Sequence, residues 1–125
     1  MTTESPAALA MVTIDCADPS KEAEFWAAAL GWKVTYADDN YGMASDGTLR
    51  LGFGRVDDWQ RPEWPNPAGT KQFHLDLAVD DLAAAEEQLL ALGATKPTDQ
   101  PGDTWTVLLD PDGHPFCLTK AANWG

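Results

Sequence analysis

The stretch Gln72–Gly93, QFHLDLAVDDLAAAEEQLLALG, decides the fold of this chain. Its first half alternates apolar and polar residues, a period of two that predicts a strand with one packed face. In its second half leucine and alanine recur at helical spacing, after Asp80 at the position of an N-cap. Gly93 stands where a residue in the left-handed conformation commonly ends a helix. The stretch therefore predicts a strand, a short turn and an amphipathic helix.

The same pattern occurs near the N-terminus. Residues 11–16 alternate in the same way, Asp18-Pro19 predicts a capped helix start, and Leu30-Gly31 predicts the helix end. Unrelated helices would share leucines, but not the cap, the stop and the preceding strand, so we interpret the pattern as an internal duplication. The matching residues are a cap, a helix stop and two strand positions: Asp18 with Asp80 and Gly31 with Gly93 at an offset of 62 residues, and Thr13 with His74 and Asp15 with Asp76 at an offset of 61.

Each predicted helix is followed by short apolar runs separated by turn residues, so each half is expected to be β-α-β-β-β. The further strands are predicted at 32–37, 41–45 and 49–54 in the first half, and at 95–96, 105–109 and 116–119 in the second. The proline-rich stretch 56–71 lacks periodicity and is expected to be a linker. We predict one α+β domain over residues 1–125: module one at about 11–55, module two at about 72–120, a loose tail at 1–10 and a short tail at 121–125.

Composition narrows the classes of function. The net charge of −12 argues against nucleic acid, whose phosphates attract basic surfaces. No stretch reaches the roughly 18 apolar residues of a membrane span, and the N-terminus does not resemble a signal peptide. Cys16 and Cys117 lie in apolar strands, which favours free thiols over a disulfide framework. We therefore expect a cytoplasmic protein with no nucleic-acid or membrane partner.

Two segments, HLDLAVDDL at 74–82 and DPDGHPFCL at 110–118, together with the paired modules, resemble the vicinal oxygen chelate superfamily. The resemblance covers about 11–120 and is strongest to the branch of glyoxalase-like and bleomycin-resistance-like proteins. It implies a cupped mixed sheet built from two modules, with helices on the outer face and ligands bound in the cup. It also implies a homodimer.

The resemblance implies metal ligands on the first and last strand of each module. Carried over, these positions give Thr13, His74 and Cys117, while the strand at 49–54 offers no histidine, cysteine or carboxylate. A catalytic metal normally has three protein ligands or more. We therefore expect no metal and no other cofactor. If a divalent metal (Zn, Mn, Ni or Fe) is bound, His74 and Cys117 are its predicted ligands.

Each polar candidate has a functional and a structural interpretation. His74 is suited to act as an acid or base near neutral pH, with Asp76 as its partner, or it hydrogen-bonds a neighbouring carboxylate. Asp15 and Asp76 are an acid–base pair or bind backbone amides at the strand ends. Cys117 is a nucleophile or a small buried apolar residue.

Six tryptophans in 125 residues point to a ligand that stacks on rings. Trp59 and Trp64 either line a pocket mouth or cover the edge of the core. The leading prediction is binding of a small hydrophobic or aromatic molecule without a metal, as in resistance or sequestration proteins. The alternative is a metal-dependent or acid–base lyase, isomerase or dioxygenase that uses His74. The predicted ligand-binding residues come from both modules and the linker: Thr13, Asp15, Arg50, Gly52, Trp59, Trp64, His74, Trp105 and Cys117.

Overall fold

The computed structural model describes residues 6, 8–66 and 73–124. The chain forms two compact units, Met1–Asp57 and Asp58–Gly125. Residues 56–66 of the linker predicted at 56–71 are described. Residues 67–72, which include the rest of the linker and the start of the predicted strand at Gln72, lie outside the described residues. Among the residues that are described, neither helix combines the length and apolar content needed to cross a membrane.

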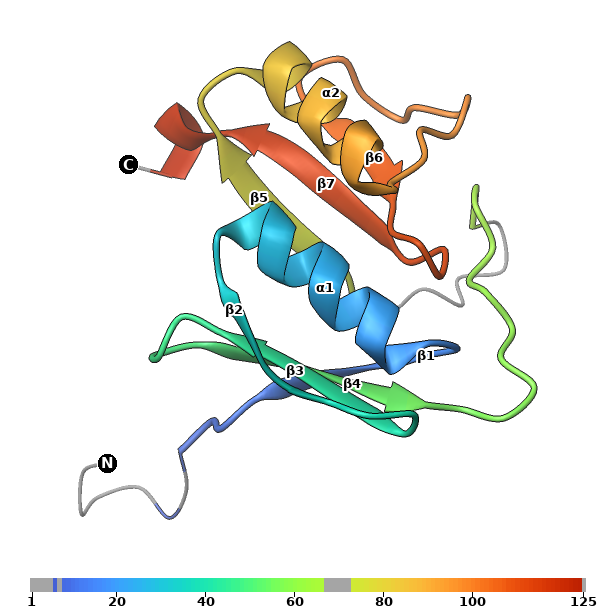
Figure 1. The fold of residues 1–125 in the computed structure, drawn as a ribbon. Coiled ribbons are helices and arrows are strands. Elements are labelled where there is room, and N and C mark those ends of the chain that lie inside the picture. Colours follow the sequence, from blue (N-terminus) through green and yellow to red (C-terminus); the bar gives the residue numbers. More distant parts are fainter. Residues whose placement is uncertain (1–5, 7, 67–72, 125) are drawn as a thin grey trace. The chain divides into compact units, whose positions relative to one another are not determined.

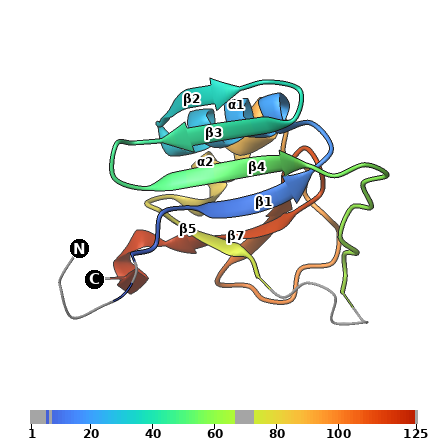
Figure 2. The same ribbon diagram turned by 90° about the horizontal axis from the view of Figure 1, so that it is seen from below.

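The first unit is a four-stranded mixed sheet with one helix (Figures 1 and 2). The strand order is β1-β4-β3-β2, with β1 parallel to β4 and the other pairs antiparallel. All the elements predicted for this half are present, with boundaries shifted by one residue at most. They are β1 (Val12–Cys16), α1 (Pro19–Leu30), β2 (Lys33–Ala37), β3 (Tyr41–Ser45) and β4 (Arg50–Arg55).

Helix α1 packs against β2, β3 and β4 and builds the core of this unit. Trp26 and Phe53 are both 1% exposed, and the rings of Phe25 and Trp26 meet edge to face at 5.2 Å. At Gly42 the helix approaches the sheet so closely that a Cβ atom would lie 2.5 Å from the carbonyl oxygen of Pro19. The residue must therefore be glycine. Side chains that alternate with Phe53 point to the opposite face, which we call the open face of the sheet.

The second unit has the same order of strand, helix and strands, but its sheet has three strands (Figure 1). The order is β5-β7-β6, with β5 parallel and β6 antiparallel to β7. Helix α2 lies against β6 and β7, and Leu89, Leu108, Phe116 and Leu118 are buried. The elements are β5 (Leu75–Val79), α2 (Leu82–Leu92), β6 (Thr106–Leu109), β7 (Pro115–Lys120) and a 3-10 helix η1 (Ala121–Trp124), where we expected a short tail.

The fourth strand expected in this unit, at 95–96, is reduced to a single bridge. Thr95 and Leu109 exchange backbone hydrogen bonds of 2.9 and 2.8 Å. Farther along the edge of β6, the side-chain amide of Gln100 replaces the missing backbone: its Oε1 accepts from Val107 N and its Nε2 donates to Val107 O, both at 2.9 Å. The edge of β6 is thereby satisfied without a full strand.

The boundaries also correct two details of the sequence repeat. The N-cap of α2 is Asp81, which accepts from Ala84 N at 3.1 Å, and not Asp80. β1 and β5, like the two N-caps, are then 63 residues apart, so the strand offset of 61 is wrong by two residues. The first-unit counterparts of His74, Asp76 and Cys117 are thus Met11, Thr13 and Gly52.

Candidate functional site

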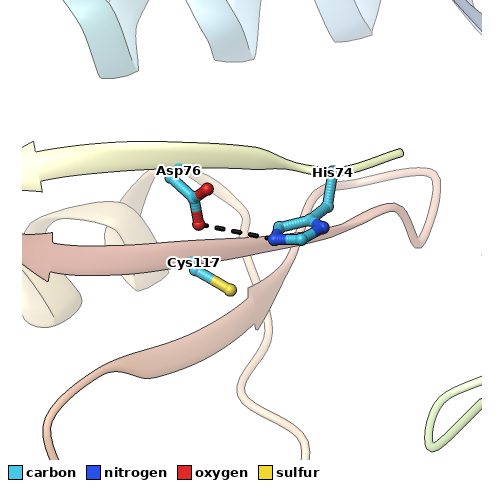
Figure 3. Close-up of side chains that lie close together, drawn as sticks. All are labelled: His74, Asp76 and Cys117. Carbon is cyan, nitrogen blue, oxygen red and sulfur yellow. Dashed lines mark ion pairs between the residues drawn. The ribbon is translucent and has the colours of Figure 1, made fainter. Parts of the chain in front are cut away.

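A cluster of three polar side chains lies on one face of the second sheet (Figure 3). Cys117 alternates with the buried Phe116 and Leu118 and so points to the opposite face, which we call the open face of this sheet. The parallel register of β5 and β7 places Asp76 beside Cys117. His74 precedes Asp76 by two residues and therefore points to the same face. His74 Nε2 and Asp76 Oδ1 form an ion pair at 3.4 Å, and ligand atoms of all three residues lie within 4.8 Å of one another. We call His74, Asp76 and Cys117 the polar cluster.

The cluster combines accessible and shielded groups. The side chains of His74 and Asp76 are 37% and 40% exposed, whereas Cys117 is 8% exposed. An imidazole paired with a carboxylate can transfer protons, because the carboxylate stabilises the charged imidazole. A nitrogen, an oxygen and a sulfur that converge can also hold a metal ion. The geometry of the polar cluster is therefore compatible with proton transfer and with metal binding.

The polar cluster forms part of a pocket of about 450 Å³ within the second unit. Three tryptophans line this pocket, all of them from outside the strands of the sheet: Trp64 comes from the segment before β5, Trp105 from the loop before β6, and Trp124 from η1. A pocket that combines large apolar surfaces with a few polar groups is typical of small-molecule sites, which measure about 300–1,000 Å³. The other lining residues are Pro101, Thr104, Val107, Thr119 and Asn123.

Backbone and side-chain contacts hold the three indoles in place. Trp64 Nε1 donates to Asp99 O at 2.9 Å, and Trp124 Nε1 donates to Thr119 Oγ1 at 2.7 Å. Trp105 lies against Gly102, where a Cβ atom would come within 2.3 Å of the indole ring. Gly102 is thus required for the position of Trp105. Because the N–H groups of Trp64 and Trp124 are already bonded, their rings offer a ligand mainly their faces.

The predicted ligand-binding residues separate into three groups. Trp64, Trp105, His74 and Cys117 line the pocket, and Asp76 joins them. Trp59 lies outside this pocket: its Nε1 donates to Asp112 O at 3.2 Å and its ring contacts His114 at 5.1 Å. The remaining predicted residues belong to the sheet of the first unit, and their role in binding stays a prediction: Thr13, Asp15, Arg50 and Gly52.

A sequence model of the glyoxalase-like domain family matches residues 11–119, which is most of the chain. The chain belongs to the glyoxalase-like domain family. The prediction of the vicinal oxygen chelate superfamily is confirmed, as is its α+β fold of mixed sheets with helices. Among curated proteins, no sequence matches this glyoxalase-like domain.

Solved structures share the fold of this glyoxalase-like domain at low sequence identity. A glyoxalase/bleomycin resistance protein/dioxygenase family enzyme from Burkholderia phytofirmans is 18% identical, with a TM-score of 0.68 over 92% of this chain and 99% of that chain. A fosfomycin resistance protein from Mesorhizobium loti is 14% identical, with a TM-score of 0.64 over 93% and 92%. The trypanothione-dependent glyoxalase I of Leishmania major is 17% identical, with a TM-score of 0.63 over 94% and 89%. These likenesses establish the fold alone.

Metals are common in this superfamily, and the polar cluster is a donor set that can be judged chemically. One imidazole, one carboxylate and one thiolate suit zinc, which accepts nitrogen, oxygen and sulfur ligands. Hard ions such as Mg²⁺ and Ca²⁺ prefer oxygen ligands throughout. The side chains of this glyoxalase-like domain therefore fit zinc better than a hard cation.

Sequence reasoning missed three parts of the site. Asp76 was expected as a catalytic partner but not as a third metal donor, although its spacing of two from His74 on a strand indicated a shared face. The sequence pattern places Trp124 in a short tail, and only the 3-10 helix at Ala121–Trp124 brings it to the pocket. The role of Gly102 could not be predicted from the sequence pattern, because it depends on the position of Trp105.

Proposed function

We propose that this glyoxalase-like domain binds a small hydrophobic or aromatic molecule in the tryptophan-lined pocket of its second unit. The observation that carries the proposal is the joint placement of Trp64, Trp105 and Trp124 around a pocket that also contains the polar cluster. The indoles supply stacking surfaces, and the polar cluster supplies a small number of directional contacts. The binding mode requires no metal.

Exposed aromatic surface supports the proposal. Trp105 and Trp124 are 37% and 61% exposed, which is costly for such large apolar side chains unless a ligand covers them. Aromatic pairs contribute about 0.5–1.5 kcal/mol beyond the burial of apolar area. A flat ring system placed between these faces would be stabilised both by the burial of apolar area and by aromatic stacking.

The polar cluster supports orientation of such a ligand. His74 and Asp76 are accessible, and an imidazole can donate or accept a hydrogen bond according to its protonation state. A phenol, carboxylate or carbonyl group on the ligand would be directed to His74, while the ring system lies against the indoles. We therefore expect aromatic molecules with one polar substituent to bind more tightly than unsubstituted hydrocarbons.

The experiment is a screen of flat aromatic compounds by intrinsic tryptophan fluorescence and calorimetry, with EDTA present. For compounds that bind, Trp105→Ala is expected to weaken affinity about tenfold or more, since stacking and burial are both lost. Trp59→Ala is the matched control, because Trp59 lies outside the pocket. Equal losses in the two variants, after circular dichroism has shown both to be folded, would refute the pocket assignment.

A second candidate function is acid–base catalysis by His74, and the His74–Asp76 ion pair at 3.4 Å favours it. In such a lyase or isomerase, His74 would move a proton on the bound molecule and Asp76 would stabilise the charged imidazole. His74→Gln is expected to abolish turnover and to preserve affinity within about threefold, because it keeps hydrogen-bonding capacity but does not titrate. If the wild type shows no turnover and His74→Gln only weakens ligand affinity, binding remains the function.

The homodimer and the cytoplasmic location stay predictions. Superfamily members often form dimers, which makes a dimer the first expectation for this chain. Size-exclusion chromatography with light scattering measures the mass directly.

A further inference from the structure

We infer that Cys117 captures ligands covalently, by adding its thiol to flat aromatic molecules that carry an α,β-unsaturated carbonyl group. The inference rests on the proposed function, because the indoles of the pocket must first bind the aromatic ring. It goes beyond that function, since a carbon–sulfur bond makes the capture stoichiometric and long-lived. The reaction requires no metal.

The two cysteines of this chain differ in their surroundings. Cys16 is 0% exposed, and its Sγ donates a hydrogen bond to Gly54 O at 3.5 Å, as expected of a thiol with a structural role. Cys117 is 8% exposed, and it lines the pocket that contains the tryptophans. The pocket therefore gives a bound molecule access to Cys117, whereas Cys16 does not line it.

An acid–base pair lies beside the Cys117 thiol. A ring nitrogen of His74 and the Sγ of Cys117 lie within 4.8 Å of each other, and Asp76 Oδ1 is 3.4 Å from His74 Nε2. A thiol becomes a strong nucleophile when a neighbouring base takes its proton and a third group orients that base. Such contacts are commonly long until a substrate is bound. Figure 3 shows the imidazole and the thiol directed to one space, so rotation of the accessible His74 side chain brings them together.

The addition conserves all atoms. The imidazole of His74 takes the thiol proton, and the sulfur of Cys117 forms a bond to the β carbon of the ligand. The π-electron pair of the carbon–carbon double bond moves toward the α carbon and the carbonyl oxygen, which gives an enolate. His74 then returns the proton to the α carbon. Nothing leaves, and neither an oxidant nor a reductant is needed.

The pocket favours this class of electrophile. A carbonyl conjugated with a double bond and a ring is flat, so it stacks against indole faces such as that of Trp105. The polarizable sulfur of cysteine is well matched to conjugated carbon. Because Trp105 and Cys117 line the same pocket, ring placement and addition occur at one site.

The test uses benzylideneacetone, in which an enone is attached to a phenyl ring, and 4-phenylbutan-2-one, which lacks the reactive double bond. The full chain is incubated with each ketone; binding is measured by calorimetry and the mass of the chain by mass spectrometry. We expect both ketones to bind, but only benzylideneacetone to raise the mass, by one molecule per chain. Proteolysis should place the added mass on the peptide that contains Cys117.

Matched variants assign the roles. Cys117→Ser keeps the size of the side chain but is a much weaker nucleophile, so it should lose the adduct and still bind the saturated ketone within about threefold of the wild type. Cys16→Ser changes the thiol that does not line the pocket, and it should form the adduct as the wild type does. His74→Gln should slow the addition by about 100-fold or more, because proton transfer is lost.

The two measurements separate this inference from the proposed function. If benzylideneacetone binds but the mass of the chain does not change, covalent capture is overturned and reversible binding stands. If neither ketone binds and no adduct forms, the inference fails together with the proposed binding of this class of molecule. An added mass that lies on Cys16, or that persists in Cys117→Ser, would also overturn the inference.

Discussion

The open faces of the two sheets differ although their scaffolds are alike. In each unit a strand runs parallel to the last strand of its sheet and is followed by an aspartate-capped helix that ends at a glycine. In the second unit the open face carries His74, Asp76 and Cys117. In the first unit a Cβ atom on Gly52 would lie 2.7 Å from Met11 Sδ and 3.0 Å from Thr13 Oγ1, so the equivalent three residues also lie together. The scaffold therefore gathers three side chains at this point, and residue identity decides their chemistry.

The outer edges of the sheets differ as well. The first unit completes its sheet with β2, paired to β3. The second unit replaces that strand with the Thr95 bridge and the side-chain amide of Gln100. The segment thus released from the sheet provides Pro101, Thr104 and Trp105 to the pocket wall. The shorter sheet of the second unit thus accompanies the pocket described above.

The largest expected effect comes from rebuilding the polar cluster in the first unit. In Met11→His/Thr13→Asp/Gly52→Cys, the atoms that crowd a Cβ at residue 52 belong to the two side chains being replaced. If the scaffold alone gathers the donors, bound zinc should rise by about one equivalent per chain relative to the wild type. Mass spectrometry after dialysis measures the change. The double variant Met11→His/Thr13→Asp lacks the thiolate and is the control; a triple variant that is folded but no better than this control would contradict the comparison.

A smaller effect is expected from removing the side-chain amide of Gln100, which takes the place of a strand beside β6. Gln100→Ala leaves the N–H and C=O of Val107 without partners at a residue that is 1% exposed. Each buried unsatisfied group costs about 1–3 kcal/mol, so unfolding in urea should show a loss of about 2–6 kcal/mol for the two groups. The loop that carries Trp105 should loosen, and aromatic ligands should bind more weakly.

Gln100→Glu separates the accepting contact of this side chain from its donating contacts. It keeps an oxygen that can accept from Val107 N, but it loses the donor to Val107 O and to Pro97 O. Its stability should therefore lie between those of the wild type and Gln100→Ala. Stability equal to the wild type in both variants would show that the amide does not substitute for a strand.

The smallest effect concerns the β3–β4 turn and its dependence on pH. The carboxylate of Asp46 accepts from Leu49 N and Thr48 N, both at 2.8 Å, and these hydrogen bonds lower its pKa below the ordinary 3.8. Because the folded pKa is the lower one, the stabilisation is complete above pH 3.8 and is lost as pH falls through the folded value. In Asp46→Asn the unfolding free energy should decline less across this range. The free energy of unfolding is measured in urea at several pH values for both proteins. If it declines equally with falling pH in both, the Asp46 carboxylate does not contribute to the pH dependence of stability.

The turn between β6 and β7 contrasts with this exposed turn. Asp110, which is 1% exposed, accepts through Oδ1 from His114 N at 2.9 Å and Asp112 N at 3.1 Å. Both turns use the same hydrogen-bonding device, which aspartate favours for local reasons. Burial gives the turn of the second unit the larger structural role, and Asp110→Ala should be more destabilising than Asp46→Ala.

Local sequence determined most of the elements of this protein. Asp18-Pro19 and Gly31 set the limits of α1, and alternation of apolar residues set the strands, because caps, glycine stops and strand periodicity act over a few residues. The family was also accessible from sequence, through the segments at 74–82 and 110–118. The pattern could not distinguish Asp80 from Asp81 as a cap, since both are aspartates beside the same turn.

The tertiary structure alone decided which residues meet. Asp76 and Cys117 are 41 residues apart, and only the parallel register of β5 and β7 brings them together. The repeat offset, the Gln100 contact with β6, and the separation of Trp59 from Trp64 and Trp105 likewise depend on pairings between distant segments. Sequence periodicity reports the face on which a side chain lies, but the neighbour on that face is set by sheet register and loop packing.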